Sequence, residues 1–359
     1  MSIEPTAGPP IPFTEAFGLQ GAVVSWSPLD GGHIHTSLLV ACTGGRYVVQ
    51  RFNRRVFPDI DAVQENCGRI VRHLAEKAWV VPRQVPARSG QLWHEDGEGT
   101  AWRAFEYLEG TERHDLVTGV ADAAEAARLF GTFLTDMGDL PLPPLRVTKP
   151  QFHDLPHRAL ALEGAVARDE CGRRASSAPE IGSARALAHR VRQLLDPVLA
   201  GLPQRIVHND AKMANVRFAS GTDSAVTVVD LDTVMVGPVL HDVGELVRTA
   251  TTHAGEDAVD PGTVDFDLDL LGALAAGYLA GTGGALTREE VASLHLAGPW
   301  LAVENGLRFL TDHLEGDHYF PVTRPEQNLD RCRTQLALVT RMLDRLNETH
   351  LLFAEAAAR

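Results

Sequence analysis

A short stretch in the second half of the chain carries side chains that together can handle phosphate groups. Asp210 is followed five residues later by Asn215, and Asp230 comes directly after the apolar run 226–229. A carboxylate can orient an acceptor hydroxyl and take its proton, while an amide oxygen and a second carboxylate suit Mg²⁺. Lys212 adds a cation that can reach a transferring phosphoryl group. The spacing predicts metal-dependent phosphoryl transfer, with Asp210 and Lys212 as catalytic residues and Asn215 and Asp230 as metal ligands.

The residues around this stretch predict the elements that position it. Residues 226–229, Val-Thr-Val-Val, are typical of a strand, so Asp230 is expected at the end of a hairpin. The tripeptide 208–210, His-Asn-Asp, is by itself typical of a polar turn between strands. The spaced Asn215 and Lys212 favour the functional interpretation, because a plain turn requires neither.

Residues 203–248 connect this stretch to a known family. Residues 208–215 read His-Asn-Asp-Ala-Lys-Met-Ala-Asn, residues 228–238 read Val-Val-Asp-Leu-Asp-Thr-Val-Met-Val-Gly-Pro, and residues 241–248 read His-Asp-Val-Gly-Glu-Leu-Val-Arg. In these motifs the chain resembles the aminoglycoside phosphotransferase (APH) family of small-molecule kinases, and within it the N-acetylhexosamine 1-kinases most. Further matches extend the likeness over most of the chain: residues 32–36, 47–53, 56–58, 308–312 and 319–320. Residues 140–200 carry no matching motif.

The resemblance implies an α+β, two-lobed protein-kinase-like fold. Residues 1–109 would form a β-rich N-terminal nucleotide-binding lobe, and residues 110–359 a mainly helical C-terminal lobe with the catalytic loop and the acceptor site. The length of 359 residues agrees with two lobes, because it exceeds what one hydrophobic core usually serves. The implied reaction is ATP-dependent phosphorylation, with Mg²⁺, of a hydroxyl of a hexose, an N-acetylhexosamine or a related cyclitol. The anomeric hydroxyl is the preferred expectation.

Candidate nucleotide-binding residues lie in the first 109 residues. Gly32 precedes a predicted strand, where backbone N–H groups can bend over phosphates, although an ordinary turn explains it about as well. Gln50 and Arg51 point to opposite faces of the next strand, so only one can face the nucleotide. The resemblance favours Gln50 and charge favours Arg51. In the family, backbone groups around Glu106 and Leu108 would bind adenine, whereas the sequence alone indicates only an edge strand and a turn.

A helix is predicted over residues 59–79, because apolar residues recur there at helical spacing. Glu65 lies in its middle, where a protein kinase carries the glutamate that pairs with a strand lysine. This chain departs from that pattern, since its lysines are only Lys77, Lys149 and Lys212. None of them precedes the helix on a strand.

The acceptor site is expected near a long helix that follows the capping box at Thr287. Glu304, Arg308 and Asp312 are spaced by four and share one face of that helix. For Glu304 and Asp312, a solvated salt-bridge ladder is an equally good interpretation. The resemblance implies that Arg308 and Tyr319 contact the sugar, together with Asp210, and that His33 approaches it from the other lobe.

Two metal-site alternatives fit the sequence less well. His241-Asp242 is the dipeptide of HD-type metal phosphohydrolases, but no further histidine or aspartate ligands stand at suitable places. In the kinase-like interpretation, Asp242 supports the catalytic loop through backbone hydrogen bonds. His33 and His35 suggest zinc, yet no third or fourth ligand is evident.

Composition indicates a cytoplasmic protein without nucleic-acid or membrane partners. The formal net charge of −14 would repel both nucleic acid and anionic lipid. The N-terminus, Met-Ser-Ile-Glu-Pro, has neither the basic nor the apolar region of a signal peptide, and no apolar run is long enough to span a bilayer. The four cysteines are scattered, which is typical of small hydrophobic residues in a reducing compartment.

Two rival functions remain open. An aminoglycoside or other antibiotic O-phosphotransferase would also fit, because an acidic protein attracts a cationic acceptor. A non-catalytic kinase-like binding module is the second rival, although Asp210, Asn215 and Asp230 are all present. The expected partners are ATP and a small-molecule acceptor, and the sequence leaves monomer and homodimer open.

Overall fold

The computed structural model describes residues 13–29 and 34–359, which fall into two compact units. Unit 1 comprises Met1–Thr111 and Leu142–Lys149, and unit 2 comprises Glu112–Pro141 and Pro150–Arg359. The chain therefore leaves unit 1, forms the first helix of unit 2 and then returns to unit 1 for residues 142–149. The sequence did not predict this return. The predicted sites Gly32 and His33 lie outside the described residues.

Unit 1 is built on an antiparallel sheet of short strands, in the order β1-β2-β3-β6-β4 with β5 beside β6. The strands are β1 (Val23–Leu29), β2 (Thr36–Cys42), β3 (Gly45–Arg51), β4 (Gln84–Val85), β5 (His94–Glu95) and β6 (Ala101–Glu106). The predicted hairpin is confirmed, with Cys42 opposite Gly45. The edge-strand interpretation of residues 102–110 is wrong, because β6 pairs with β3, β4 and β5. A weakly periodic sequence cannot report how many neighbours a strand has.

The two faces of this sheet differ in character. One face packs buried apolar residues of α1 (Phe13–Ala16) against alternate strand residues such as Leu38, Val49 and Trp102. Strand alternation places Ser37, Gln50 and Arg103 on the other face.

The predicted helix of unit 1 is confirmed as α2 (Ile60–Glu76), and Asp59 caps it by accepting a hydrogen bond from the N–H of Ala62 at 2.9 Å. Glu65 is exposed, and its carboxylate lies 3.6 Å from the guanidinium of Arg146. Glu65 therefore pairs with an arginine of the returning segment 142–149.

Unit 2 carries two short antiparallel pairs that bracket the motif stretch. β8 (Arg205–Val207) pairs with β11 (Met235–Gly237), and β9 (Val216–Ala219) pairs with β10 (Ala225–Val228). Single 3₁₀ turns lie at η1 (Met213–Asn215) and η2 (Leu231–Thr233). The predicted hairpin before Asp230 is thus confirmed. β7 (Thr111–Glu112) marks the sequence boundary of the units.

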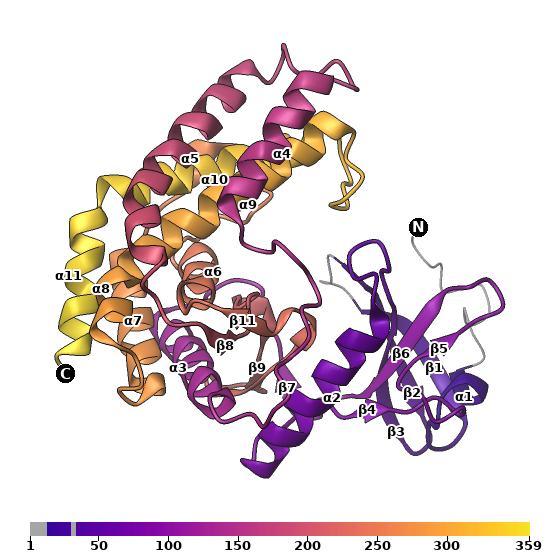
Figure 1. Ribbon diagram of the computed structural model, residues 1–359. Coiled ribbons are helices and arrows are strands. Elements are labelled where there is room, and N and C mark those ends of the chain that lie inside the picture. Colours follow the sequence, from indigo (N-terminus) through magenta and orange to yellow (C-terminus); the bar gives the residue numbers. More distant parts are fainter. Residues whose placement is uncertain (1–12, 30–33) are drawn as a thin grey trace. The chain divides into compact units, whose positions relative to one another are not determined.

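Helices form the rest of unit 2. They are α3 (Val120–Met137), α4 (Leu155–Arg168), α5 (Ala178–Leu199), α6 (Leu240–Ala250), α7 (Leu268–Thr282), α8 (Arg288–Ser293), α9 (Ala297–Glu315), α10 (Gln327–Asp344) and α11 (Leu346–Ala357), with 3₁₀ turns η3 (Pro261–Thr263) and η4 (Leu294–Leu296). α4, α5, α6 and α10 pack on α9, and Figure 1 shows α4, α5 and α10 gathered around it. α6 approaches α9 so closely that a Cβ at Gly244 would lie 2.6 Å from the carbonyl oxygen of Ala297.

The expected long helix after Thr287 is interrupted. The capping box exists, since Thr287 and Glu290 exchange hydrogen bonds, but α8 ends at Ser293 and α9 begins at Ala297 after a 3₁₀ turn. Pro299 explains the break, because it has no N–H to donate and its ring would clash with the preceding turn of a continuous α-helix. Within the described ranges, no helix is long and apolar enough to cross a membrane.

Candidate phosphoryl-transfer site

Residues 208–215, the candidate catalytic loop, are supported by α6. The carboxylate of Asp242 accepts the backbone N–H groups of His208 at 2.9 Å and Asn209 at 2.7 Å. This confirms the supporting role expected for Asp242. Burial raises the pKa of Asp242 to about 7, against the effect of these two donors. Nδ1 of His241 lies 2.7 Å from Oδ1 of Asn209, so the His241-Asp242 pair serves the loop.

Asn209 brings the chain into a left-handed turn just before Asp210. Its φ is +64°, a conformation that asparagine tolerates better than most residues. Its side-chain amide donates to the carbonyl oxygen of Thr233 at 2.9 Å, and the hydroxyl of Thr233 donates to the carbonyl oxygen of His208 at 2.9 Å. The turn η2 is thereby fastened to the loop.

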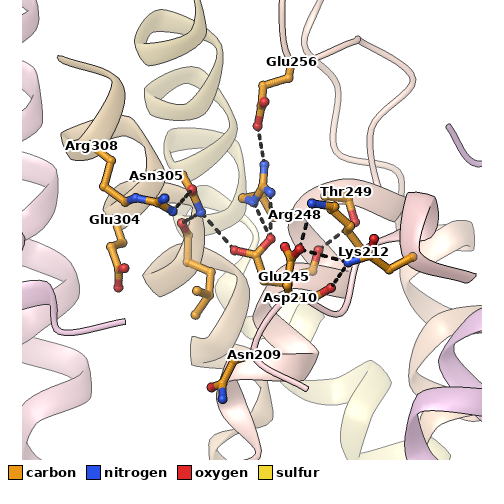
Figure 2. Close-up of polar contacts among 12 residues, drawn as sticks. Asn209, Asp210, Lys212, Glu245, Arg248, Thr249, Glu256, Glu304, Asn305 and Arg308 are labelled. Carbon is orange, nitrogen blue, oxygen red and sulfur yellow. Dashed lines mark hydrogen bonds and ion pairs between the residues drawn. The ribbon is translucent and has the colours of Figure 1, made fainter. Parts of the chain in front are cut away.

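Asp210, Lys212 and Asn215 meet in this loop (Figure 2 shows the first two). Nζ of Lys212 donates to Oδ2 of Asp210 at 2.8 Å, and Nδ2 of Asn215 donates to the same oxygen at 2.9 Å. Oδ1 of Asp210 accepts no hydrogen bond from the residues that the structure describes, so it is the oxygen that can receive an acceptor hydroxyl. The side chains of Asp210 and Lys212 keep 19% and 23% of their surface exposed, which leaves them accessible.

Charge pairing determines the ionisation of both residues. Burial acts to raise the pKa of Asp210, but the charge and hydrogen bond of Lys212 outweigh it, so the pKa lies below its usual range. Burial acts to lower the pKa of Lys212, but Asp210 and then Asp230 raise it above its usual value. The loop therefore holds an ionised carboxylate beside an ionised ammonium at neutral pH.

Asn215 and Asp230 offer oxygens that suit Mg²⁺. Nδ2 of Asn215 is turned toward Asp210, donating also to its carbonyl oxygen at 2.8 Å, so the amide oxygen points the other way. The N–H of Val229 donates to the carbonyl oxygen of Asn215 at 2.9 Å, which brings the end of β10 beside Asn215. Asp230 follows in a left-handed conformation, with φ of +65°, and its carboxylate is exposed. An amide oxygen and a carboxylate are hard ligands that fit Mg²⁺.

His208 anchors the start of the loop through a side chain that is buried and uncharged. Its ring packs against Phe130 and Phe133 of α3 and is fully buried. Nε2 lies 3.0 Å from the carbonyl oxygen of Val229, which makes this nitrogen the donor. Burial lowers the pKa of His208 to about 4. The sequence assigned no role to this residue.

His153 is a further residue at the loop that the sequence did not indicate. Its Nε2 lies 2.6 Å from the carbonyl oxygen of Asn209, and its Nδ1 lies 3.3 Å from the carboxylate of Glu304. Each ring nitrogen of His153 thus faces one acceptor oxygen. His153 connects α9 to the residue before Asp210. It falls in the section without a motif, so no sequence signal could have found it.

The interpretation of Glu304 and Asp312 as a solvated ladder is wrong, because Glu304 is 0% exposed and Asp312 is 5% exposed. Burial acts to raise the pKa of Glu304, but His153, Arg158 and Arg308 outweigh it and hold it below its usual range. Charges spaced by four look the same in sequence whether water or other helices cover them.

Asp312 shapes the loop that carries Tyr319. Its Oδ1 accepts the backbone N–H groups of His318 at 2.9 Å and Tyr319 at 2.8 Å, and its Oδ2 accepts that of Phe320 at 2.9 Å. The ring of Tyr319 then lies 5.8 Å from the guanidinium of Arg308. The two residues expected to contact the acceptor are thus neighbours.

Arg308 is oriented by a chain of hydrogen bonds between α9 and α6 (Figure 2). It donates to Oδ1 of Asn305 at 2.9 Å, and Nδ2 of Asn305 donates to Glu245 at 3.0 Å. The other oxygen of Glu245 accepts from Arg248 at 2.7 Å. Glu245 also lies near enough to Lys212 to help raise the pKa of that lysine. A single polar network therefore extends from Arg308 toward the catalytic loop.

In unit 1, Gln50 and Arg51 have different surroundings. Gln50 is half-buried and bonds to Ser37 and Arg103, whereas Arg51 is exposed on the opposite face. At the predicted adenine-binding segment, the N–H of Glu106 donates to the carbonyl oxygen of Arg83, and the hydroxyl of Thr111 donates to the carbonyl oxygen of Leu108. The N–H of Leu108 has no partner within the described part of the chain.

The zinc alternative gains no support from the histidine that the structure describes. Nδ1 of His35 accepts the backbone N–H of Asn53 at 3.1 Å, and the ring stacks on Phe52 and Phe57. Among the described residues, the grouping that could hold a metal by its donors is His253, Asp265 and Asp267, which contains neither His35 nor the His241-Asp242 pair.

Comparisons with known proteins bear on the family and the fold of this chain. A model of the phosphotransferase enzyme family (APH) matches residues 25–290. The fold resembles a microcompartment-associated aminopropanol kinase, with TM-score 0.63 and 17% identity over 94% of this chain and 97% of that one. It resembles an aminoglycoside phosphotransferase from Alicyclobacillus acidocaldarius, with TM-score 0.59 and 13% identity over 98% of both chains. An amicoumacin kinase solved with AMP-PNP and Ca²⁺ matches with TM-score 0.55 and 12% identity over 87% of both chains.

The expected α+β protein-kinase-like fold is confirmed by these matches. Identities of 17% or less carry the likeness in fold and not the choice of acceptor. The family match covers most of the chain and includes the loop that holds Asp210 and Asn215. The chain therefore belongs to the phosphotransferase enzyme family and is a small-molecule kinase.

Proposed function

We propose that this kinase transfers the γ-phosphoryl group of ATP to a hydroxyl of a neutral sugar, such as a hexose or an N-acetylhexosamine, or of a related cyclitol. The anomeric hydroxyl is the proposed acceptor position. The observation that carries the proposal is the setting of Arg308, which is oriented by Asn305 and lies beside Tyr319 in the same unit as Asp210.

The roles of the loop residues follow from their bonds. Oδ1 of Asp210 accepts the acceptor hydroxyl, aims its oxygen at the γ-phosphorus and takes its proton as the new bond forms. Lys212 leaves its ion pair with Asp210 to follow the transferring phosphoryl group.

Asn215 and Asp230 would hold Mg²⁺ through the amide oxygen and the carboxylate. The metal, when bound, neutralises charge on the β- and γ-phosphates. The bonds from Asn215 to Asp210 keep the amide oxygen turned away from the base. The left-handed turn at Asp230 keeps its carboxylate at the end of β10.

A neutral acceptor suits the charges near Arg308. Burial and then the positive charge of Arg308 lower the pKa of Arg158, so two cations share this part of unit 2. The carboxylate of Glu304 faces His153, Arg158 and Arg308 and is compensated by them. A polyamine would be repelled by the two arginines, whereas sugar hydroxyls can accept their N–H groups. The rings of Phe152, Tyr319 and Phe320 around Arg308 add surface for the apolar face of a sugar.

An aminoglycoside or other antibiotic kinase is the second candidate. The net charge of −14 favours the approach of a cationic acceptor. Two of the structural relatives are described as kinases of an aminopropanol and of aminoglycosides.

One experiment separates these candidates. ADP release is measured with MgATP against panels of free hexoses, N-acetylhexosamines, cyclitols and aminoglycosides, and ³¹P NMR locates the phosphate on any product. We expect turnover with a neutral sugar and none with kanamycin-like compounds. Turnover only with aminoglycosides, or resistance conferred on a sensitive host, would overturn the sugar assignment.

A further inference from the structure

The backbone of Asn209, the residue before Asp210, is held on both sides. Its N–H donates to Oδ1 of Asp242 at 2.7 Å, and its carbonyl oxygen lies 2.6 Å from Nε2 of His153. A carbonyl oxygen can only accept, so Nε2 of His153 is the donor in this bond. The carbonyl belongs to the peptide group that joins Asn209 to Asp210. Because a peptide group is planar, the bond from His153 also fixes the direction in which the backbone enters Asp210.

Both residues of this bond have a left-handed backbone. The φ of Asn209 is +64°, and that of His153 is +54°. Residues other than glycine keep such a conformation where the surrounding structure fixes it, and these conformations are frequent at active sites. Helix α6 fixes Asn209 through Asp242 and His241, while His153, which precedes α4, supplies the contact on the side of Asp210. Two segments far apart in the chain therefore clamp this turn.

The other ring nitrogen of His153 faces Glu304 on α9. Nδ1 lies 3.3 Å from Oε1 of Glu304, and both side chains are 0% exposed. Nε of Arg158 lies 3.7 Å from the same oxygen. A carboxylate that engages one nitrogen of a histidine fixes the ring plane and so directs the other nitrogen at its target, which is the role of the carboxylate in catalytic triads. Glu304 therefore directs Nε2 of His153 at the carbonyl oxygen of Asn209.

We propose that His153 and Glu304 are positioning residues that aim the carboxylate of Asp210 at the acceptor hydroxyl. The proposal rests on Asp210 as the base in the proposed function. Figure 2 shows Glu304 and Arg308 on one helix, α9, where they are four residues apart and share a face. The same helix thus carries the support of the base and the residue proposed to bind the acceptor, so the two parts of the site keep a fixed distance.

The kinetics of His153→Leu in the full-length protein test the proposal. Leucine is apolar and close to imidazole in size, so the variant removes both contacts and keeps most of the packing. With MgATP and N-acetylglucosamine, or the acceptor of the panel that gives turnover, kcat should fall by about 10-fold or more, because small errors in the position of a reacting group are costly in rate. The KM for the acceptor and the calorimetric affinity for AMP-PNP should change little. His153→Gln should recover part of kcat, because its amide nitrogen can still donate to Asn209.

A double-mutant cycle separates positioning of the base from support of the fold. In Asp210→Asn no base remains to be aimed, so adding His153→Leu should lower kcat much less than it does in the wild type. If His153 only supports the fold, the two losses should multiply. His253→Gln is the matched control, since His253 also pairs with a carboxylate, that of Asp265 at 2.7 Å, but lies between α6 and α7. It should keep the kcat of the wild type.

A second variant covers the case in which thermal unfolding shows that His153→Leu does not fold. Glu304→Gln has nearly the same shape and removes the charge that engages Nδ1 of His153. It should lower kcat in the same direction, and it should lower kcat much less when Asp210 is already replaced by asparagine.

The outcomes separate this inference from the proposed function. An unchanged kcat in a folded His153→Leu protein, or losses that multiply in the cycle, would overturn the positioning role and leave the proposed function intact. A fully active Asp210→Asn protein, or a wild type that turns over no acceptor of the panel, would overturn the proposed function and the positioning role together.

Discussion

The candidate catalytic loop of unit 2 and the polar row of Ser37, Gln50 and Arg103 in the sheet of unit 1 are assembled in opposite ways. Each places a cation against a polar side chain: Lys212 lies 2.8 Å from Asp210, and Arg103 lies 2.9 Å from Gln50. In the loop the partners are two residues apart, and in the row they are 53 residues apart. Only the first arrangement is written in a continuous motif, whereas the second requires two strands to pair in register.

The two arrangements also differ in how readily a substrate can change them. The pair of Lys212 and Asp210 joins two charges that keep 23% and 19% of their side-chain surface exposed, so a substrate that enters the site can reach them. The row joins a buried guanidinium to a neutral amide. We therefore expect the loop to rearrange during the reaction and the row to stay fixed.

The largest expected effect is at Asp210. Asp210→Asn replaces the carboxylate by an amide of nearly the same size, which has no basic oxygen to take the proton, so kcat should fall by roughly 10²-fold or more, the usual scale for a general base. AMP-PNP affinity should change little, because the proposed role of Asp210 is toward the acceptor and not toward the nucleotide. Steady-state kinetics and calorimetry measure the two effects.

The control for Asp210→Asn is Asp196→Asn, because Asp196 pairs with Arg192 on the exposed side of α5. A fully active Asp210→Asn protein would remove the base assignment.

The next effect concerns the metal. Asp230→Ala removes a carboxylate that would hold Mg²⁺, so turnover and Mg²⁺-dependent binding of AMP-PNP should fall together, each by about 10-fold or more. Asp223→Ala, in the exposed turn of the same hairpin, is the matched control. If Mg²⁺-dependent binding is unchanged in Asp230→Ala, Asp232 becomes the next candidate for the ligand.

The contrast between the two regions explains what the sequence could predict. The proximity of Asp210, Lys212 and Asn215 followed from spacing alone, because a single turn fixes all three. The hairpins and the helix from Ile60 to Glu76 were also predictable, since periodicity and turn residues are local. Their chemical roles stay predictions.

Residues whose partners come from distant segments could not be predicted. Arg103 looked like one residue of an edge strand, because sheet order is not a local property. His153 reaches Glu304 across 151 residues from a section without a motif. The burial of Glu304 depends on helices that pack over it, and the spacing of charged residues by four carries no information about those helices. The break before α9 was visible in principle, because Pro299 was available to indicate it.

A pH experiment tests whether the buried side chain of His208 is uncharged in the folded protein, in contrast to the charged pair of Asp210 and Lys212. Burial lowers the pKa of His208 to about 4 in the folded protein, whereas an unfolded histidine titrates near 6.5. Between these values the unfolded state binds more protons, so stability falls as the pH falls. From pH 6.5 to pH 5 this group should remove about 1.6 kcal/mol from the free energy of unfolding.

His208→Gln should lose less stability over the same pH range, because glutamine does not titrate and can still donate to the carbonyl oxygen of Val229. Urea unfolding of both proteins at the two pH values measures the difference. His241 is buried too, with its pKa lowered well below the usual value, but it contributes equally to both proteins. Equal losses in the two proteins would mean that His208 is not held neutral.

The smallest expected effect lies at Arg308, whose orienting partner Asn305 is three residues away on the same helix. It is therefore a third case, a cation whose partner is local, as in the loop, but lies on one helix. Arg308→Ala should raise the KM for the sugar by about 10-fold, the scale of one to two lost charge-assisted hydrogen bonds, and leave the KM for ATP nearly unchanged.

Tyr319→Phe is the companion variant for Arg308→Ala. It removes one hydroxyl from a ring that is 41% exposed and leaves the bonds of Asp312 to the loop backbone in place. A smaller rise in the KM for the sugar is expected, because a single neutral hydrogen bond is worth only about 1 kcal/mol. If the KM for ATP rises in Arg308→Ala as much as that for the sugar, the network through Asn305 and Glu245 supports the catalytic loop as a whole. Arg308 would then have a structural role, and recognition of the sugar would have to come from other residues.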